Sequence, residues 1–399
     1  MPNRPCWVEI STCALEDNYR FLRAACGGGG LAGDMAVELL AIVKADAYGH
    51  GLGICAPAVV RAGARWLGVT SVEEGVAARA LCPEAEILII SGPFRGQGAA
   101  VLANRLTPVV WEDWQLDELE IAALTAGAAE QTVSVHLELD TGMSRQGVSA
   151  EGLGVVLERF EASSPLRLDG LMTHLYAADE TDGTTSHEQF ERLEPMVTRI
   201  FDAGLRPKLL HAGNSAALLS GDGPRLLNDL CGRYGLRAML RPGLALYGLA
   251  PEFTPAEPAQ VTTLRAGLQP VLTWKTRIVS IHSLAPGDVV GYNGTFVASE
   301  PMRIALLAVG YADGLRRELS NCGSALIQGQ PAPITGRISM DQTVVDITEV
   351  PAAAIGDEVV LIGRQRDAVL SAEEHALWAS TIPWEIFTSI SARVERIEL

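Results

Sequence analysis

The sequence lacks the features that mark several common classes of protein. The seven cysteines are scattered and form no Cys-x-x-Cys pair, so the sequence predicts neither a zinc cluster nor a disulfide framework. No apolar run approaches the length of a membrane-spanning helix. The first residues, MPNRPCWVEIS, contain no apolar core like that of a secretory signal peptide. We therefore expect a cytoplasmic protein with no membrane partner and no metal site.

The chain is also poor in positive charge. It contains 31 Lys and Arg residues against 48 Asp and Glu, which gives a net charge of −17. An acidic surface argues against nucleic acid and anionic membranes as partners, although a site can still be locally basic. With 399 residues, 48% of them apolar, the chain is long enough for a large domain and a smaller companion.

Short apolar strands alternate with helical patterns through the first part of the chain. The expected strands lie near residues 39–43, 66–71, 86–91, 107–111, 133–139, 168–174, 208–212 and 237–241. A strand followed by a helix, repeated eight times, is typical of a (β/α)8 TIM-type barrel. A doubly wound open sheet is the alternative. We favour the barrel because the strand count is eight and no GxGxxG motif opens the first unit.

The pattern changes at a cluster of prolines between residues 251 and 270, which predicts a linker. Beyond it, strand-like runs separated by Gly, Pro and Asp predict a C-terminal all-β domain; they span residues 271–284, 289–293, 302–309, 324–328, 343–347, 358–363 and 387–399. We therefore assign residues 12–255 to the barrel and 256–399 to the β domain. Residues 1–11 are expected to form a strand that joins the β domain.

Polar residues follow the predicted barrel strands at their C-terminal ends, which is the catalytic face of such a barrel. They are Lys44, Asp140 with Arg145, His174, His211 with Asn214 and Ser215, and Arg241. Lys44 has two interpretations. It could extend from the strand end into solvent, or its amine could sit in a pocket with a lowered pKa, ready to form a Schiff base with an aldehyde cofactor. Tyr48, Gly49 and Gly51 nearby favour the second interpretation, because they offer a hydroxyl and close backbone approach.

Six motifs in this order resemble those of bacterial alanine racemases. They are AIVKADAYGHG (41–51), LDTGMSRQG (139–147), HAGNSAA (211–217), RPGLALYG (241–248), AVGYADGLRR (308–317) and GRISMDQ (336–342). The resemblance implies an N-terminal barrel, a C-terminal β domain and the cofactor pyridoxal 5′-phosphate (PLP). It also implies racemisation of L-alanine and D-alanine, which supplies D-alanine for cell-wall peptidoglycan.

The resemblance also assigns the catalytic residues. Lys44 would carry PLP and act as the base on one face of the substrate, with Tyr311 as the base on the opposite face. His174 and Arg241 would support Tyr311. Arg241 would face the pyridine nitrogen, and because arginine can only donate hydrogen bonds, that nitrogen would be unprotonated.

Cofactor and substrate contacts follow in the same way. The resemblance implies that PLP is bound by Lys44, Tyr48, Asn214, Ser215, Arg241, Gly243 and Leu244. The substrate carboxylate would meet Arg145 and the backbone N–H of Met340. In this family two chains pack head to tail, so a homodimer with shared active sites is expected, each taking Lys44 from one chain and Tyr311 from the other.

Two positions depart from the family pattern. Glu138 stands where many members have a lysine, often carbamylated, and could brace Arg145 through a salt bridge. Ala392 stands where some members have a tyrosine that reaches toward the phosphate. Broad-specificity and serine racemases of the same fold remain alternatives. So do a PLP-dependent decarboxylase, for which Cys322 would have to be the catalytic cysteine, and a PLP carrier without catalysis.

Overall fold

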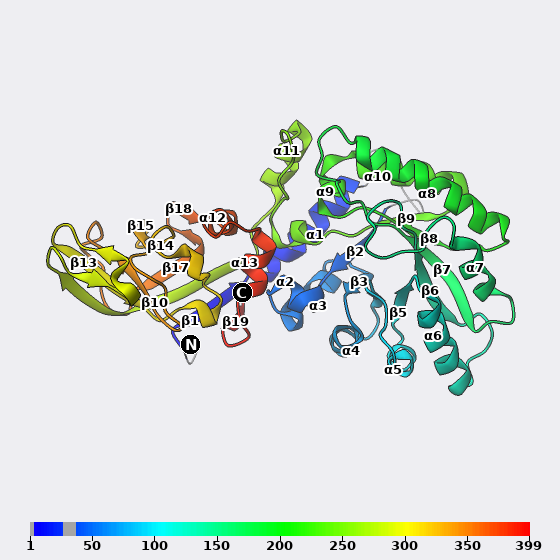
Figure 1. Ribbon diagram of the computed structural model, residues 1–399, viewed down its shortest axis with the longest axis horizontal. Helices are drawn as coiled ribbons and strands as arrows, with labels where there is room; N and C mark the ends of the chain where they lie inside the picture. Colours follow the sequence, from blue (N-terminus) through cyan, green and yellow to red (C-terminus); the bar gives the residue numbers. More distant parts are fainter. Residues whose placement is uncertain (1–3, 27–36) are drawn as a thin grey trace. The chain divides into compact units, whose positions relative to one another are not determined.

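Eight parallel strands pair in chain order and close into a barrel in this computed structural model, which describes residues 4–26 and 37–399 (Figure 1). The strands are β2 (Glu38–Ile42), β3 (Trp66–Val69), β4 (Glu86–Ile89), β5 (Thr107–Val110), β6 (Val133–Glu138), β7 (Leu166–Met172), β8 (Leu209–His211) and β9 (Arg237–Leu240). The predicted barrel is confirmed, and the closed strand order excludes the open doubly wound sheet.

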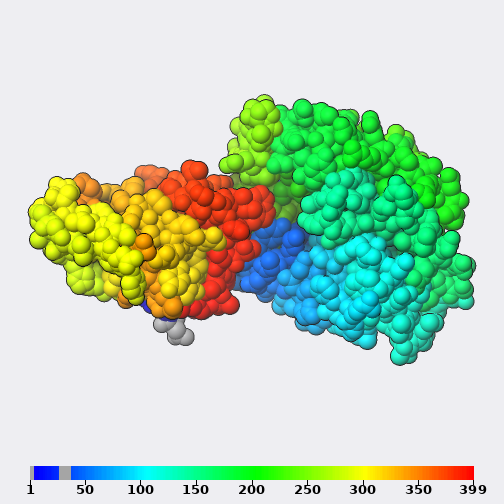
Figure 2. All heavy atoms as spheres, in the orientation of Figure 1, coloured from blue at the N-terminus to red at the C-terminus, as the bar shows by residue number. Residues whose placement is uncertain are grey.

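Helices follow the strands and cover the outside of the barrel. Because helices cover the strands, strand residues are buried on both faces, and every residue of β3 and β5 is buried. The cyan and green segments that carry these helices pack side by side in the space-filling view (Figure 2). The helices are α1 (Thr12–Cys26), α3 (Leu52–Arg61), α4 (Val72–Leu81), α5 (Gly98–Ala103), α6 (Asp113–Thr125), α7 (Leu153–Leu157), η1 (Glu158–Phe160), α8 (Thr184–Asp202), α9 (Ser215–Ser220) and α10 (Asp222–Tyr234).

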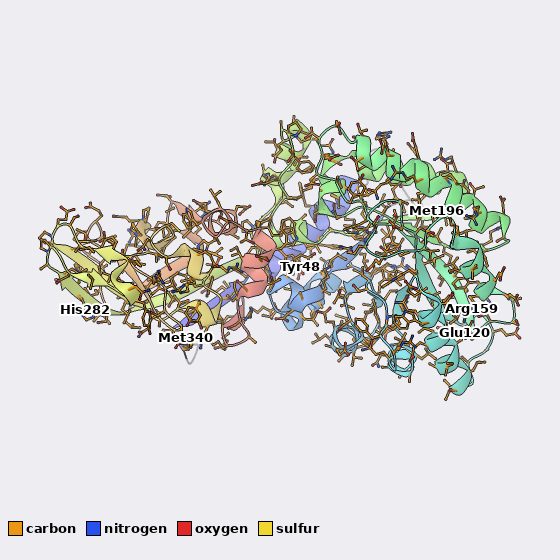
Figure 3. The ribbon with its side chains drawn as sticks, in the orientation of Figure 1. Tyr48, Glu120, Arg159, Met196, His282 and Met340 are labelled. Atoms are coloured by element: carbon orange, nitrogen blue, oxygen red, sulfur yellow. The ribbon has the colours of Figure 1, made fainter. Side chains whose placement is uncertain are left out.

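Charged side chains join neighbouring helices on the outer layer. Arg159 of η1 donates to Glu120 of α6, with 2.7 Å between Nη2 and Oε2 (Figure 3). The Arg159 side chain also pairs with Asp117, one turn earlier on α6. Such partly exposed pairs contribute roughly 0–1 kcal/mol each. Packing of the apolar helix faces therefore dominates the stability of this layer.

The second unit is a nine-stranded sheet in which β10 (Leu272–Leu284) is the central strand. β10 pairs antiparallel with β1 (Cys6–Ile10), β13 (Met302–Leu307) and β17 (Glu358–Gln365). β1 also pairs in parallel with β19 (Glu395–Glu398), with Trp7 opposite Glu395. The sheet is completed by β14 (Ser324–Ile327), β15 (Gln330–Pro333), β16 (Thr343–Asp346) and β18 (Ala368–Leu370).

The predicted C-terminal sheet domain is confirmed, but the strand expected over residues 387–399 is wrong in its first half. The end of helix α13 (Pro383–Ser389) occupies the first three of these residues, and strand β19 begins only at Glu395. Helix α12 (Ala372–Trp378) precedes α13. Both helices have seven residues, too few for a clear helical period. Their start signals are nevertheless present. Ser371 and Glu374 form a capping box at α12, and Pro383 is the first residue of α13.

Several short elements were not expected from the sequence. Helix α11 (Ala259–Gly267) lies within the proline-marked linker. The strand expected over 289–293 is two residues long, β11 (Val289–Val290), and is followed by η3 (Tyr292–Gly294) and β12 (Phe296–Val297). The remaining turns are η2 (Leu244–Tyr247), η4 (Tyr311–Asp313) and η5 (Arg317–Leu319).

The chain divides into two compact units with interleaved segments. The barrel unit contains Ala14–Ala47 and Cys55–Gln269, and the sheet unit contains Tyr48–Ile54, Pro270–Leu399 and the residues before Ala14. The first three residues of the segment assigned to the N-terminal strand lie outside the described residues. No helix within the described ranges is long and apolar enough to cross a membrane.

Candidate active site

Lys44 opens a left-handed turn at the C-terminal end of β2. The turn, α2 (Lys44–Tyr48), has φ values of +52° to +55° at Ala45, Asp46, Ala47 and Tyr48. Left-handed backbone costs a residue with a side chain roughly 1–2 kcal/mol, so this run is strained. The small residues of this segment give no local signal of such a turn.

Glu74 of α4 holds the start of this turn. Its carboxylate accepts hydrogen bonds from the backbone N–H of Ala45 at 2.7 Å and of Thr70 at 2.8 Å. The backbone N–H of Ala47 donates to the carbonyl of Val43 at 2.9 Å. The surrounding structure therefore fixes the strained backbone beside Lys44.

The amine of Lys44 is in an environment that disfavours its charge. Burial lowers the pKa of Lys44, and the positive charges of Arg145 and Arg241 lower it further, against an opposing effect of Glu74. The chain has two other lysines, Lys208 and Lys275. Both are ion-paired, Lys208 with Asp169 at 3.0 Å and Lys275 with Glu9 at 2.9 Å. Lys44 forms no ion pair with any residue that the structure describes, so it is the lysine best suited to be a neutral nucleophile.

Arg241 and His174 form a hydrogen-bonded pair at the ends of β9 and β7. Arg241 is 4% exposed, and its Nη2 lies 2.9 Å from His174 Nδ1 and 2.9 Å from the carbonyl oxygen of Thr173. Because arginine can only donate, His174 Nδ1 must be the acceptor. Burial and the charges of Arg241, Arg145 and Lys44 lower the pKa of His174 to about 3. His174 is therefore neutral, with its hydrogen on Nε2.

A network of hydroxyl and amide groups holds the segment that carries His174. The Thr173 hydroxyl donates to the carbonyl of Leu139 at 2.9 Å and contacts the Thr141 hydroxyl at 2.8 Å. Gln189 of α8 donates to the Thr141 hydroxyl and to the carbonyl of His174, both at 2.9 Å. Sequence reasoning missed Gln189, whose position in the middle of a helix gives no local signal of such a role.

Asn214, Ser215, Gly243 and Leu244 lie together where β8 and β9 end. Asn214 caps α9, its side chain accepting from the backbone N–H of Ala217 at 3.2 Å. The Ser215 hydroxyl accepts from the backbone N–H groups of Gly243 and Ala245, at 3.0 and 3.2 Å. Leu244 opens η2 and is fully buried. The Ser215 hydroxyl thus connects the turn after β8 to the turn after β9 and holds the two together as one corner.

The salt bridge expected between Glu138 and Arg145 is absent. Glu138 is buried at the end of β6, and its Oε2 accepts a hydrogen bond from the Gln146 amide. Arg145 is exposed and forms no ion pair with any described residue. Burial raises the pKa of Glu138, while the Gln146 hydrogen bond and the charges of Arg241 and Arg145 oppose that rise. Gln146 takes the bracing position because its amide satisfies a buried carboxylate without bringing a second charge out of water.

Tyr311 and Met340 lie together in the sheet unit. Tyr311 opens η4 after β13, and its backbone N–H donates to the carbonyl of Ser339 at 3.0 Å. The next residue, Ala312, donates to the carbonyl of Met340 at 3.0 Å. A Cβ at Gly310 would lie 2.3 Å from the Ser339 oxygen and 2.4 Å from the Met340 oxygen. Glycine is therefore required for this close backbone contact, which leaves the Tyr311 and Met340 side chains 42% and 53% exposed.

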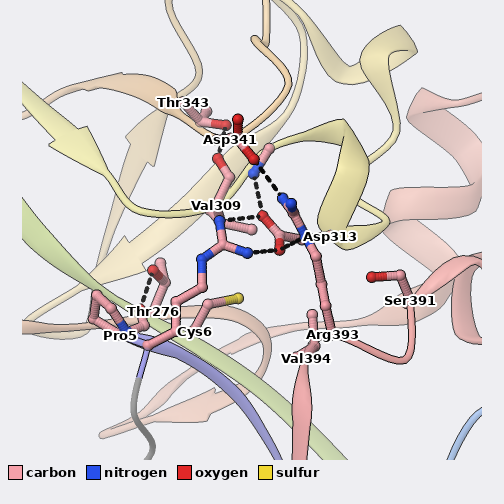
Figure 4. A network of polar contacts seen from close by, with 12 residues as sticks. Pro5, Cys6, Thr276, Val309, Asp313, Asp341, Thr343, Ser391, Arg393 and Val394 are labelled. Carbon is pink, nitrogen blue, oxygen red and sulfur yellow. Dashed lines mark hydrogen bonds and ion pairs between the residues drawn. The ribbon is translucent and has the colours of Figure 1, made fainter.

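Asp313 fixes the turn that carries Tyr311. It is fully buried, and its Oδ2 accepts from the backbone N–H of Gly310 at 2.9 Å and from Arg4 at 3.0 Å. Arg393 donates to Asp313 Oδ1 and to Asp341 Oδ1, both at 2.7 Å, and so ties the Tyr311 turn to the Met340 loop (Figure 4). Sequence reasoning missed this network, because the arginines are about 310 and 80 positions away in the chain.

Tyr48 also belongs to the sheet unit. Burial raises the pKa of Tyr48 to about 12, so its hydroxyl keeps its hydrogen and can donate. The following Gly49 accepts hydrogen bonds from Arg396 Nε and Nη2 at 3.1 and 2.9 Å. Ala392 and Cys322 are exposed, and the Cys322 thiol donates to the carbonyl of Glu318 at 3.2 Å.

The predicted site residues thus form two groups. Lys44, Arg145, His174, Asn214, Ser215, Arg241, Gly243 and Leu244 surround the C-terminal end of the barrel, whereas Tyr48, Tyr311 and Met340 belong to the sheet unit.

Sequence models of the N-terminal and C-terminal domains of alanine racemase match residues 10–251 and 271–398. The chain belongs to the alanine racemase family. A relative named alanine racemase, from Sorangium cellulosum, is 38% identical over 400 residues, which cover 98% of each chain.

Solved alanine racemases share the whole architecture. The enzyme from Streptomyces lavendulae superimposes with a TM-score of 0.87 at 30% identity, covering 100% of this chain and 98% of that one. The enzyme from Bartonella henselae, solved with covalently bound pyridoxal phosphate, gives 0.81 at 26% identity, covering 99% of each chain. The alanine racemase family thus accounts for both units of this chain.

Proposed function

We propose that this chain interconverts L-alanine and D-alanine and that PLP is its cofactor, bound through Lys44. The observation that carries the proposal is the setting of Lys44. It is the one lysine of three whose amine has no carboxylate partner among the described residues, and it lies at the barrel end that also carries Arg241 and neutral His174. Full-length similarity to alanine racemases supports the choice of substrate.

The barrel residues fit PLP. Arg241 Nη1 is buried and has no hydrogen-bond partner in the described part of the chain. A buried donor without an acceptor is unfavourable by roughly 1–3 kcal/mol, and a pyridine nitrogen would supply the acceptor. In the corner formed by Asn214, Ser215, Gly243 and Leu244, the Gly243 N–H already donates to Ser215. The backbone N–H groups of Ser215 and Leu244 are the ones suited to a phosphate, with Tyr48 as a side-chain donor. When bound, PLP supplies an electron sink for the charge left on the α-carbon of the amino acid.

The protein must then move a proton on each face of the substrate. We propose that Lys44 Nζ exchanges the α-proton on one face and Tyr311 Oη on the other. The lowered pKa of Lys44 supports its part, because a neutral amine can accept a proton. A phenol ordinarily has a pKa near ~10 and needs help to act as a base. We propose that His174, whose ring is positioned by its hydrogen bond to Arg241, donates its Nε2–H to the Tyr311 oxygen and so stabilises the phenolate.

We propose that the substrate carboxylate binds to Arg145 and to the backbone N–H of Met340. Arg145 is exposed and unpaired among the described residues, and the Met340 N–H donates no hydrogen bond to any of them. Both groups are therefore available to an anion. The short side chain at Ala392 supports weak acceptance of slightly larger substrates such as serine.

We further propose that two chains assemble head to tail, so that Tyr311 of the partner subunit completes the site around Lys44. The division of the predicted residues between two units of one chain supports this arrangement. All seven cysteines are free thiols, which supports a reducing compartment, the cytoplasm. There the enzyme would supply D-alanine for peptidoglycan.

The test compares Lys44→Ala with the control Lys275→Ala. Racemisation of common amino acids is followed by chiral chromatography, and covalent cofactor by absorption after borohydride reduction. We expect Lys44→Ala to lose activity and covalent cofactor together, and Lys275→Ala to keep both. Cofactor reduced onto Lys208 or Lys275 in the Lys44→Ala protein would contradict the assignment. Rapid turnover of serine with negligible turnover of alanine would favour a serine racemase, and carbon dioxide release a decarboxylase.

A further inference from the structure

A second polar cavity lies at the opposite end of the barrel from Lys44. It has a volume of about 280 Å³ and is lined by residues at the amino-terminal ends of the strands. Four cationic residues line it, namely Arg65, Arg167, Lys208 and Arg237, against two carboxylates, Glu86 and Asp169. In a chain with a net charge of −17, such a concentration of positive charge on one small concave surface is unexpected.

The cations differ in how well they are neutralised. Asp169 forms ion pairs with two of them. It accepts a hydrogen bond from Arg167 Nη2 at 2.8 Å and lies 3.0 Å from Lys208 Nζ. These partners hold the pKa of Asp169 well below its usual range, although burial opposes that effect. Asp169 is therefore charged, and its carboxylate oxygens already have cationic partners in the cavity wall.

Arg65 and Arg237 are poorly neutralised. Their Nη1 atoms lie 3.4 and 3.9 Å from the same oxygen of Glu38, and the structure records no other partner for either guanidinium in the described residues. A guanidinium has five N–H donors in a fork that matches phosphate and carboxylate oxygens. One carboxylate oxygen shared between two such forks leaves most of their donors available to a ligand.

A buried imidazole forms part of the same cavity wall. His136 lines the cavity and is 1% exposed, and its Nε2 is buried without a hydrogen-bond partner. Its Nδ1 lies 2.8 Å from Nε2 of His211, so one of the two rings donates to the other. A Cβ at Gly170 would lie 2.6 Å from three atoms of the His136 ring, so glycine there makes room for the imidazole. If His211 donates, His136 Nε2 carries a hydrogen and is an unused donor.

We propose that this cavity binds a small oxyanion of the phosphate class, recognised by Arg65 and Arg237 with His136 as a further donor. The volume is slightly below the usual range for drug-sized ligands, about 300–1,000 Å³, and so suits inorganic phosphate or a small phosphate ester. This inference is independent of the proposed racemase activity, because none of these residues belongs to that site.

The test uses the PLP-loaded full chain, so that the phosphate corner near Ser215 is already filled. Inorganic phosphate is titrated by calorimetry at constant ionic strength into wild type, Arg65→Ala/Arg237→Ala and the control Arg20→Ala/Arg225→Ala, which removes two exposed arginines elsewhere. We expect saturable binding that the cavity variant weakens about tenfold or more, since hydrogen bonds between a guanidinium and an oxyanion are charge-assisted and strong. The control should bind as wild type does.

Two further measurements make the result decisive. Arg145→Ala should leave phosphate binding unchanged, because Arg145 belongs to the other end of the barrel. In wild type labelled at its seven histidines, phosphate should shift the ¹⁵N resonances of the His136 and His211 pair. The inference is overturned if wild type shows no saturable binding, if the cavity variant binds phosphate within threefold of wild type, or if Arg145→Ala abolishes binding. Thermal unfolding of each variant checks that it is folded.

Discussion

At the scale of single residues, the candidate site depends on which charges are compensated. Arg241 is a buried cation whose side chain contacts neutral groups, His174 and the Thr173 carbonyl. The charge of Glu138 raises the pKa of Arg241 and so compensates it, while the Glu138 carboxylate is itself bonded to a neutral amide. This separation keeps Arg241 a strong hydrogen-bond donor, because no carboxylate occupies its N–H groups.

Removing the charge of Glu138 should therefore destabilise the barrel. We expect Glu138→Gln to lower the free energy of unfolding by about 1–3 kcal/mol, because Arg241 would remain buried without its compensating carboxylate. Urea unfolding measures the change. The control is Glu84→Gln, at an exposed position, which should alter stability by less than about 0.5 kcal/mol. Equal effects of the two substitutions would show that Glu138 does not compensate Arg241.

At the scale of single residues, the sequence predicted best those site residues whose chemistry follows from their residue type. Lys44 and Arg241 were singled out because each follows a predicted barrel strand and lies in a motif that resembles those of alanine racemases. The partner of Glu138 was not predictable, because a glutamate can accept from an arginine or from an amide with nearly the same local sequence. Only the fold determines that Gln146 is the closer donor.

At the scale of elements, the left-handed turn α2 is the feature that the sequence concealed. Its small residues are compatible with a flexible loop, whereas the structure holds four consecutive residues at positive φ. Glycine usually occupies such positions. Alanine and aspartate are tolerated here because Glu74 and the Val43 carbonyl accept the N–H groups of the turn.

A β-branched residue should not be tolerated in this turn. We expect Ala45→Val to lower the free energy of unfolding by about 1–2 kcal/mol, because branching at Cβ clashes with left-handed backbone. The same substitution at Ala77, an exposed position in right-handed α4, should cost about 0.5 kcal/mol. Thermal and urea unfolding compare the two variants. A smaller loss at Ala45 than at Ala77 would contradict the strain that we assign to α2.

The barrel strands were predicted well, and the two helices α12 and α13 of the sheet unit were not. Most barrel strands are short, largely apolar segments bounded by polar residues, and their predicted positions agree with the observed ones within two residues. Helices α12 and α13 have too few turns to show a period, and only their caps signal them. The barrel strands can therefore be predicted from their own sequence. Helices α12 and α13 cannot, because their formation depends on packing in the sheet unit.

At the scale of the whole molecule, the proposal that two chains share each site can be tested by mixing two inactive variants. Lys44→Ala and Tyr311→Phe are combined under conditions in which dimers exchange. A mixed dimer then has one doubly damaged site and one intact site. Half of the dimers are mixed, so about a quarter of all sites should regain activity.

Recovery is measured as racemisation relative to wild type at the same total protein concentration. Mixing Lys44→Ala with a second Lys44-substituted protein is the control and should recover nothing. If both bases came from one chain, every site would carry a lesion and no mixture would be active. No recovery despite demonstrated exchange would therefore reject the shared site.

Buried histidines in both units should make the fold sensitive to mild acid. Burial lowers the pKa of His136 and of His375 to about 4, against about 6.5 in an unfolded chain. Between these values the unfolded state binds protons that the folded state does not, so stability falls as the pH falls. Each histidine should contribute up to about 1.4 kcal/mol per pH unit below pH 6.5.

Urea unfolding at pH 7, 6 and 5, at one protein concentration, measures this slope. His375→Gln should reduce the slope, because one linked proton is removed. A free energy of unfolding that does not change between pH 7 and pH 5 would contradict the linkage.

The scarcity of lysine has a practical consequence for peptide mapping. A protease that cuts only after lysine divides a chain with three lysines into four fragments, with cuts after residues 44, 208 and 275. Once an amine is permanently alkylated, cleavage at that point stops. Attachment of the cofactor at Lys44, fixed by reduction, would leave the first two fragments joined as residues 1–208. The position of a covalent group could thus be read from the masses of a few large peptides, without sequencing any of them.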